Sequence, residues 1–354
     1  MQSIRIEKNM EPKKKPESAM LGFGKYFTDH MFIMDYTPEK GWHDARIVPF
    51  ANLSLSPAST VFHYGAEIFE GLKAYRTPSG EVQLFRPSEN FKRMNNSAER
   101  IRLPQLDEDF ALSALMKFVD LERDWVPDAE GTSLYLRPFL FGNDETLGVH
   151  SIHNAMYVVI ASPVGSYYPE GINPVKIMIE TEDVRAVRGG TGYAKCGGNY
   201  AASNRAGEIA EKKGFSQVLW LDGVERKYVE EVGAMNVMFK IDGVVVTPAL
   251  TGSILPGVTR KSCIQLLRDM NIPVEERLLS VDELIGAAES GRLEEAWGCG
   301  TAAVVSPIGQ LSFEGVDHIV NGGKIGEVTQ KLYDTLTGIQ WGKLPDPYGW
   351  TIKV

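Results

Sequence analysis

The sequence contains little cysteine: Cys196, Cys263 and Cys299 are the three among 354 residues. They form no CxxC pair and have no ligand-like spacing to the six histidines, so we expect no metal, and reduced thiols rather than disulfides. No apolar stretch approaches the length that spans a bilayer. Residues 1–20 lack the apolar core of a secretory signal, and their glutamates disfavour a transit peptide. These absences favour a cytoplasmic protein.

Basic residues are outnumbered by acidic ones, with 37 Lys and Arg against 46 Asp and Glu, which gives a formal net charge of −9. This balance argues against a nucleic-acid-binding surface. Hydrophobic residues make up 43% and charged residues 23%, as is typical of a globular protein, and the length suggests two domains. We therefore expect small-molecule partners, with neither nucleic acid nor membrane among them.

Strand and helix patterns alternate along the chain without a regular βαβ rhythm, which favours an α+β fold with mixed sheets and flanking helices. Residues 163–174 are rich in Gly, Pro and Tyr and predict an interdomain loop between a smaller domain, 1–162, and a larger one, 175–354. Strands are predicted at 27–35, 82–85, 133–141, 155–162, 175–180, 217–222, 235–241, 244–248 and 302–308, and helices at 88–100 (with Ser88 as N-cap), 110–124, 200–213, 259–269 and 281–290.

The most informative segment surrounds Lys195, in the run Arg-Gly-Gly-Thr-Gly-Tyr-Ala-Lys-Cys-Gly-Gly-Asn-Tyr of residues 188–200. Glycine lets the backbone approach a ligand closely, so this lysine can be presented into a crowded pocket. A desolvated lysine amine can attack an aldehyde. A nucleotide P-loop needs Gly-Lys followed by Ser or Thr, which Ala194 and Cys196 do not provide. The segment alone leaves a phosphate-binding loop or a glycine-rich turn with a solvated lysine as open alternatives.

Other segments carry weaker signals. An acid at Glu230 or Glu231, entering an apolar strand, needs a partner such as a protonated pyridine nitrogen, and strand alternation predicts that the other acid is solvated. Pro256 and Gly257 open a helix whose first N–H groups can bind an anion, and Thr301 lies in a glycine-rich turn. Arg137 stands in an apolar strand and needs a partner or a wet face. Each signal has an ordinary structural explanation when it is taken alone.

Taken in order, these motifs resemble the branched-chain aminotransferases of pyridoxal-phosphate fold type IV, the class IV aminotransferases. The resemblance covers almost the whole chain. It comprises the segments 23–31 (FGKYFTDHM), 63–75 (HYGAEIFEGLKAY), 133–138 (SLYLRP), the Lys195 run, 231–236 (EVGAMN), 255–259 (LPGVT) and 298–302 (GCGTA). Ala303 and Ser306 stand where vertebrate members have a redox CxxC pair, so thiol switching is not expected.

The resemblance implies a two-domain enzyme with pyridoxal phosphate at the domain interface, assembled as a homodimer. It implies that Lys195 carries the cofactor as a Schiff base and moves the α-proton. The other cofactor-binding residues would be Arg93, Tyr200, Glu231, Val258, Thr259 and Thr301, and the substrate-binding residues Phe23, Tyr64, Phe69, Tyr135, Arg137 and Ala302. Ala234 replaces a threonine that reaches the substrate carboxylate in some members, which affects binding detail.

The implied reaction is a ping-pong transfer of the amino group between leucine, isoleucine or valine and 2-oxoglutarate. Within the same fold, the alternatives are a D-amino-acid aminotransferase, an aminodeoxychorismate lyase or an amine-specific relative. Outside it, the alternative is a non-catalytic protein that binds phosphate or another anion on the same loops.

Overall fold

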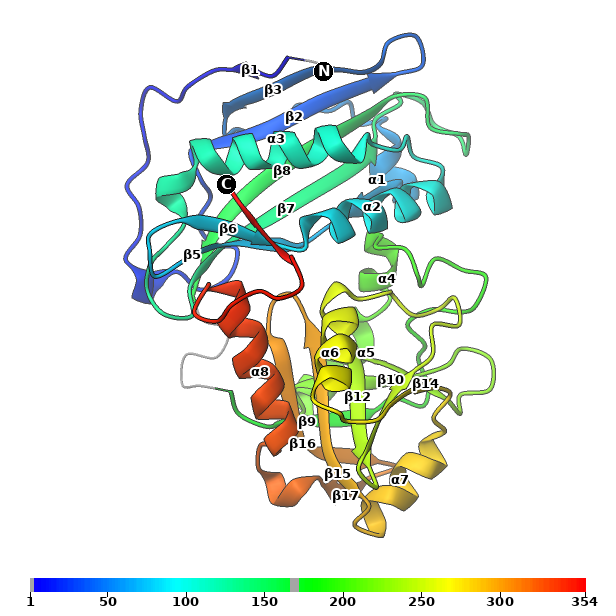
Figure 1. Ribbon diagram of the computed structural model, residues 1–354. Coiled ribbons are helices and arrows are strands. Elements are labelled where there is room, and N and C mark those ends of the chain that lie inside the picture. The colour runs from blue at the N-terminus through cyan, green and yellow to red at the C-terminus, as the bar shows by residue number, and fades with distance from the viewer. Residues whose placement is uncertain (1–2, 166–171) are drawn as a thin grey trace. The chain divides into compact units, whose positions relative to one another are not determined.

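The structure, a computed structural model, describes residues 3–165 and 172–354 (Figure 1). The chain divides into two compact units. The first comprises the chain up to the 166–171 segment together with Ala194–Gly197 and Gly338–Val354, and the second comprises the rest. Part of the loop expected at 163–174 therefore lies outside the described residues. The observed α+β architecture confirms the predicted fold class.

The first unit is built on a mixed sheet in the strand order β1-β3-β2-β8-β7-β5-β6-β18, with β4 paired to β7. All its pairings are antiparallel except that of β1 with β3. The strands are β1 (Arg5–Ile6), β2 (His30–Thr37), β3 (Gly41–Pro49), β4 (Glu67–Phe69), β5 (Leu72–Arg76), β6 (Val82–Phe85), β7 (Ser133–Gly142), β8 (Ala155–Val164) and β18 (Thr351–Lys353). The chain's last strand thus completes the sheet that its N-terminal part begins.

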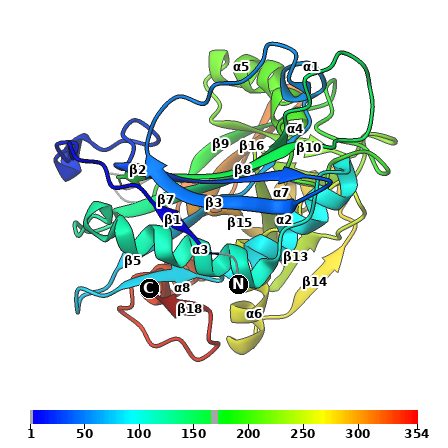
Figure 2. The same ribbon diagram turned by 90° about the horizontal axis from the view of Figure 1, so that it is seen from above.

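Helices α2 (Pro87–Ile101) and α3 (Glu108–Leu121) cover one face of this sheet, and the short helix α1 (Thr60–Tyr64) lies on the other (Figure 2). The larger core forms under α2 and α3, where Phe91, Met94 and Phe118 pack on the strands. A smaller cluster around Met31 and Ile33 packs beneath α1. Short 3₁₀ turns occur at Ser18–Met20 and Arg123–Trp125.

The second unit contains a closed ring of strands. Its order is β11-β10-β9-β16-β15-β12-β13-β14, and β11 also pairs with β12, so the six strands from β11 to β12 close on themselves. The strands are β9 (Val175–Ile179), β10 (Gln217–Leu221), β11 (Val229–Val232), β12 (Met235–Ile241), β13 (Val244–Pro248), β14 (Val274–Arg277), β15 (Leu293–Gly300), β16 (Val304–Phe313) and β17 (Val316–Ile319). Val237, Phe239 and Leu311 belong to the apolar cluster of this ring.

Helices surround the ring: α4 (Gly197–Ala201), α5 (Asn204–Lys212), α6 (Val258–Asp269), α7 (Val281–Glu289) and α8 (Glu327–Gln340), with a 3₁₀ turn at Asn321–Gly323. Ala206 and Ala210 seat α5 on β10, and Leu284 seats α7 on the core of the ring. No helix in the described part of the chain is both long and apolar enough to cross a membrane.

Most predicted elements are present within a few residues, and three details differ. The residue before α2 is Arg86 in a left-handed conformation (φ 50°), with Pro87 in the first turn, so the prediction of Ser88 as N-cap is wrong. The helix expected at 200–213 is broken into α4 and α5, and residues 302–303 form a turn before β16. Lys195 and the last residues of the chain, expected in the second domain, group with the first unit.

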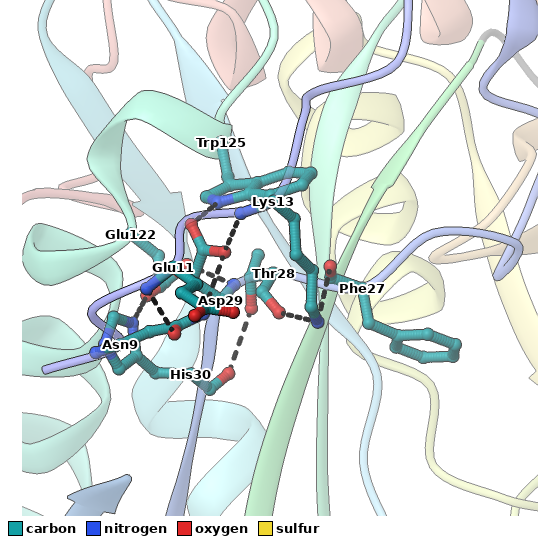
Figure 3. Close-up of polar contacts among 9 residues, drawn as sticks. All are labelled: Asn9, Glu11, Lys13, Phe27, Thr28, Asp29, His30, Glu122 and Trp125. Atoms are coloured by element: carbon teal, nitrogen blue, oxygen red, sulfur yellow. Dashed lines mark hydrogen bonds and ion pairs between the residues drawn. The ribbon is translucent and has the colours of Figure 1, made fainter. Parts of the chain in front are cut away.

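A buried polar network attaches the N-terminal segment to the first sheet (Figure 3). The Asn9 N–H donates to Nε2 of His30 (2.7 Å), so the ring proton lies on Nδ1, which hydrogen-bonds Glu122. The Asp29 carboxylate accepts from the Lys13 N–H (2.7 Å) and from the Trp125 indole (2.9 Å). Burial alone would raise the pKa of Asp29, but these hydrogen bonds together outweigh it and hold the pKa below its usual range.

We expect Asp29→Asn to weaken this attachment, because an amide cannot accept every hydrogen bond that the carboxylate accepts. The expected loss at pH 7 is ~1–2 kcal/mol, measured from the urea-unfolding midpoint. Since the folded pKa is depressed, the difference from wild type should be present at neutral pH and disappear as the pH falls through that pKa. Asp124→Asn is the control, because the Asp124 side chain is 87% exposed. A difference between Asp29→Asn and wild type that persists unchanged in acid would contradict this account.

Candidate active site

The backbone of Lys195 is fixed by the first unit. Its N–H donates to the Ser97 hydroxyl (2.9 Å), and its carbonyl accepts from the Phe69 N–H (3.0 Å). The N–H of Gly197 bonds the Glu67 carboxylate so closely that a Cβ at position 197 would lie 2.0 Å from the carboxylate oxygen. The Lys195 ammonium lies 4.8 Å from the centre of the Phe69 ring. The glycine-rich run therefore presents the lysine in a defined place, as the sequence predicted.

Arg93 is held in a buried two-point ion pair with Glu70. The Nε and one terminal nitrogen of the guanidinium donate to the two carboxylate oxygens at 2.7 and 2.8 Å, and Asn90 donates to the same carboxylate at 2.8 Å. Burial alone would raise the pKa of Glu70, but Arg93 and, more weakly, Lys195 outweigh it and hold the pKa low. Glu70 thus remains an anion that orients Arg93 and contributes negative potential at Lys195.

Four of the predicted substrate residues form one aromatic and cationic cluster in the first unit. The guanidinium carbon of Arg137 lies 4.7 Å from the centre of the Phe69 ring, and one of its nitrogens donates to the Tyr135 hydroxyl (3.0 Å). The Phe23 ring, 49% exposed, meets Tyr135 edge-on at 4.9 Å between centroids. A Cβ at Gly71 would lie 2.1 Å from the Tyr135 hydroxyl, so glycine is needed there.

Tyr64 is the predicted substrate residue of the first unit that this cluster does not include. It ends α1, is 45% exposed, and its ring contacts that of His63 at 6.2 Å. No hydrogen bond or ring contact within residues 3–165 or 172–354 joins it to the other predicted residues.

In the second unit, Glu231 is buried at the β11–β12 hairpin, with 3% of its surface exposed. Asn236, its cross-strand partner, donates from Nδ2 to Glu231 (3.0 Å) and to the Leu255 carbonyl (2.9 Å). Arg185 Nε lies 2.6 Å from the other carboxylate oxygen, as an ion pair rather than a well-directed hydrogen bond. Glu231 is therefore a fixed, charge-balanced carboxylate.

Glu230 is buried as well, so the expectation that one of the two acids is solvated is wrong. It is 4% exposed, and Ser253 donates a short hydrogen bond to it. Burial raises the pKa of Glu230, with the Ser253 hydrogen bond and the charge of Arg185 opposing the rise. The reason is topological: β11 pairs on both edges inside the closed ring, and loops cover both of its faces.

Glu231 and Tyr200 line one cavity of about 460 Å³ in the second unit. Asn199, at the start of this wall, is fixed by two hydrogen bonds of 2.9 Å with Thr191. Ala234 and Leu255 add apolar lining. The cavity thus combines a phenol with a carboxylate that is buried and charge-balanced.

The remaining predicted residues of the second unit lie in two turns. Val258 and Thr259 form the first turn of α6, and the preceding N-cap residue, Gly257, has no side chain to cap the helix. Thr301 and Ala302 form the half-buried turn between β15 and β16. Both turns can present N–H groups to an anion, as the sequence indicated.

Four residues that position this site were missed from the sequence: Ser97, Glu70, Arg185 and Asn236. Glu70 carries the same signal that drew attention to Arg137, a charge next to apolar strand residues. Ser97 and Asn236 are ordinary polar residues, and nothing in their local sequence marks them. Their partners are distant in the chain, so the contacts appear only in the folded protein.

We expect Glu70→Gln to be strongly destabilising, because it leaves Arg93 as a buried charge without its counter-ion. The expected loss in the free energy of unfolding is about 3–5 kcal/mol, measured by urea denaturation. Glu89→Gln on the same helix is the matched control, since Glu89 makes a longer contact of 3.9 Å with the exposed Lys92 and should change stability by less than about 1 kcal/mol. Equal effects in the two variants would argue against a structural role for the buried pair.

Comparisons with known proteins agree with the resemblance. The model of the amino-transferase class IV family matches residues 67–311. The chain is 54% identical to branched-chain-amino-acid aminotransferase 2 of Bacillus subtilis, over 100% of this chain and 97% of that protein. Among solved structures, it is similar to the branched-chain amino acid aminotransferase of Escherichia coli, with a TM-score of 0.77, 26% identity and coverage of 91% and 98% of the two chains.

A second solved relative carries a ligand. It is a branched-chain amino acid aminotransferase, of the source abbreviated T.th., complexed with N-(5'-phosphopyridoxyl)-L-glutamate. Its TM-score is 0.74 at 26% identity, with coverage of 94% of this chain and 98% of that one.

Proposed function

The chain belongs to the class IV aminotransferase family, and from this premise we propose that it is a branched-chain amino-acid transaminase that uses pyridoxal phosphate. The names of its relatives support the substrate class. The observation on this chain that carries the proposal is the placement of Lys195, whose backbone is fixed on both sides while its amine lies against Phe69.

The residues present fit the cofactor. Glu231 is a buried anion beside a cavity that Tyr200 also lines, so it suits a pyridine nitrogen, with Tyr200 for the ring oxygen. Arg93 would bind the phosphate, and Glu70 sets its orientation. The backbone of Val258 and Thr259 and the Thr301 hydroxyl would bind the same phosphate. When bound, pyridoxal phosphate supplies the electron sink that makes the α-proton of an amino acid removable.

The protein itself contributes attachment and proton transfer. Lys195 would be the point of covalent attachment, and its Nζ would then carry the proton that leaves and returns to the substrate. Ser97 and Phe69 hold the lysine backbone, so its Nζ moves only as far as its side chain allows. The Glu70 anion favours a proton at Nζ by its potential.

Two kinds of substrate must use one pocket in turn. Phe23, Tyr64, Phe69, Tyr135 and Ala302 would provide the surface for a branched aliphatic side chain. Arg137 would pair with the second carboxylate of glutamate or 2-oxoglutarate, and the solved relative that contains a glutamate adduct supports this assignment. We propose 2-oxoglutarate as the amino acceptor, and a cytoplasmic homodimer as the working form, which light scattering of the pure protein tests directly.

The first experiment is an absorption spectrum of the purified protein before and after leucine. We expect a visible band of bound cofactor that leucine removes and 2-oxoglutarate restores, because each substrate drives one half of the reaction. Lys195→Ala should retain no turnover. A visible band that responds to a D-amino acid or an amine instead of leucine would favour another member of the fold. No band after incubation with pyridoxal phosphate would leave a non-catalytic anion-binding protein.

Replacing Arg137 should separate the two substrates. We expect Arg137→Met to raise KM for 2-oxoglutarate about 10–100-fold, the value of a hydrogen bond to a charged group, with KM for leucine changed little. Arg137→Lys keeps the charge and should recover part of the affinity. Steady-state kinetics with each substrate varied in turn provides the measurement, and an equal rise in both KM values would show that Arg137 is not specific for the second carboxylate.

A further inference from the structure

The turn that joins β7 to β8 brings together three side chains that the proposed reaction does not use. Asp144, His150 and His153 each offer one oxygen or nitrogen ligand atom, and these atoms all lie within 4.8 Å of one another. Within this described turn, no hydrogen bond joins the carboxylate to either imidazole ring. Ligand atoms of a tetrahedral zinc site are about 3.3 Å apart, as follows from metal–ligand distances of about 2.0–2.1 Å. The three groups are therefore close to binding distance.

His150 is in the protonation form that binds metals. Its Nδ1 lies 2.7 Å from the Ser151 carbonyl, which can only accept, so the ring proton is on Nδ1. Nε2 then presents a lone pair, and it is buried without a hydrogen-bond partner. Metal-ligating histidines commonly donate their second ring nitrogen to a backbone carbonyl in this way. A buried acceptor with no partner is unfavourable, and a bound cation would remove this cost.

Asp144 is a buried carboxylate whose orientation is fixed. It is 4% exposed, and Oδ1 accepts from the Asn154 N–H (2.8 Å) and side-chain amide (2.9 Å). Oδ2 accepts from the His153 N–H alone (3.0 Å), so it retains a lone pair. No Lys or Arg in the described ranges forms an ion pair with Asp144. Buried carboxylates are usually paired with a cation or coordinate a metal.

His153 can complete the set because its side chain is exposed. Its ring is stacked nearly parallel to that of His150, with 5.8 Å between centroids and 8° between planes. Residues 145–149 of the same turn are exposed too. Closing the ligand atoms from 4.8 Å to about 3.3 Å therefore requires a small movement of exposed chain.

We propose that Asp144, His150 and His153 form a binding site for a divalent transition metal of the zinc type. Two imidazole nitrogens and one carboxylate oxygen suit zinc and its neighbours, whereas calcium and magnesium prefer oxygen ligands alone. Water would take the fourth position. The Asp144 carbonyl accepts from the Thr60 N–H (3.1 Å), so the metal would stiffen the turn where it meets the start of α1. The sequence analysis weighed histidines only against cysteines and expected no metal.

The test uses the untagged holoenzyme and zinc chloride in equilibrium dialysis with metal analysis. We expect one zinc ion per chain in the wild type. His150→Ala and His153→Ala should each bind at least about 100-fold more weakly, because even the loss of a supporting residue costs roughly 10–100-fold. His43→Ala is the matched control: its Nδ1 also contacts a backbone carbonyl, Gly41 O at 2.9 Å, but it lies outside the cluster. It should bind zinc like the wild type.

A second measurement separates binding from misfolding. Zinc should raise the thermal midpoint of the wild type and of His43→Ala in a concentration-dependent way, and should leave that of His153→Ala unchanged. His153 is exposed, so its replacement should preserve the far-ultraviolet circular dichroism spectrum and leucine turnover. The absence of zinc binding in the wild type, or binding by the two cluster variants equal to that of the wild type, would overturn the proposal. Loss of transaminase activity on its own would count against the proposed function and leave this site intact.

Discussion

The ion pair between Arg93 and Glu70 is the contact on which the first unit's part of the site depends. Both side chains are buried, so neither charge is tolerable without the other. Glu70 follows β4, and Arg93 lies on α2, so the pair joins the sheet to the helix that also contributes Ser97 to the Lys195 backbone. The position of the lysine therefore follows from that of the ion pair. A phosphate-binding arginine that is already oriented also loses little conformational freedom when an anion arrives.

The second unit meets the same constraint with different chemistry. Glu231 is buried at a hairpin, and Arg185 and Asn236 hold one carboxylate oxygen each. Asn236 also bonds the Leu255 carbonyl, just before the turn that opens α6. One amide thus sets both the carboxylate that faces the cavity and the loop that leads to the helix N-terminus. Buried polar groups of this kind are stable only when all are satisfied, so the hydrogen bonds that hold Glu231 also hold the loop in one conformation.

The sequence was sufficient to predict the fold class, most elements and the role of Lys195, because these depend on local patterns and on several motifs in a fixed order. The β12–β13 hairpin at Asp242-Gly243 was found for this reason. The burial of both Glu230 and Glu231 could not be predicted, since it follows from a strand paired on both edges of a closed ring. The grouping of β18 with the first sheet depends on pairing between residues far apart in the chain, which no local signal carries.

Phe69 explains how one pocket can accept both an aliphatic side chain and a carboxylate. The Lys195 ammonium and the Arg137 guanidinium lie 4.8 and 4.7 Å from the centre of its ring. A ring stabilises a nearby cation through its quadrupole by ~0.5–1 kcal/mol, without competing for the cation's N–H hydrogens as an acceptor oxygen would. Arg137 is thus kept close to an apolar surface by a partner that is itself apolar. When the substrate is aliphatic, the ring provides the contact; when it is a dicarboxylate, the arginine does. An acid in place of Phe69 would pair with Arg137 permanently, and this second mode of binding would be lost.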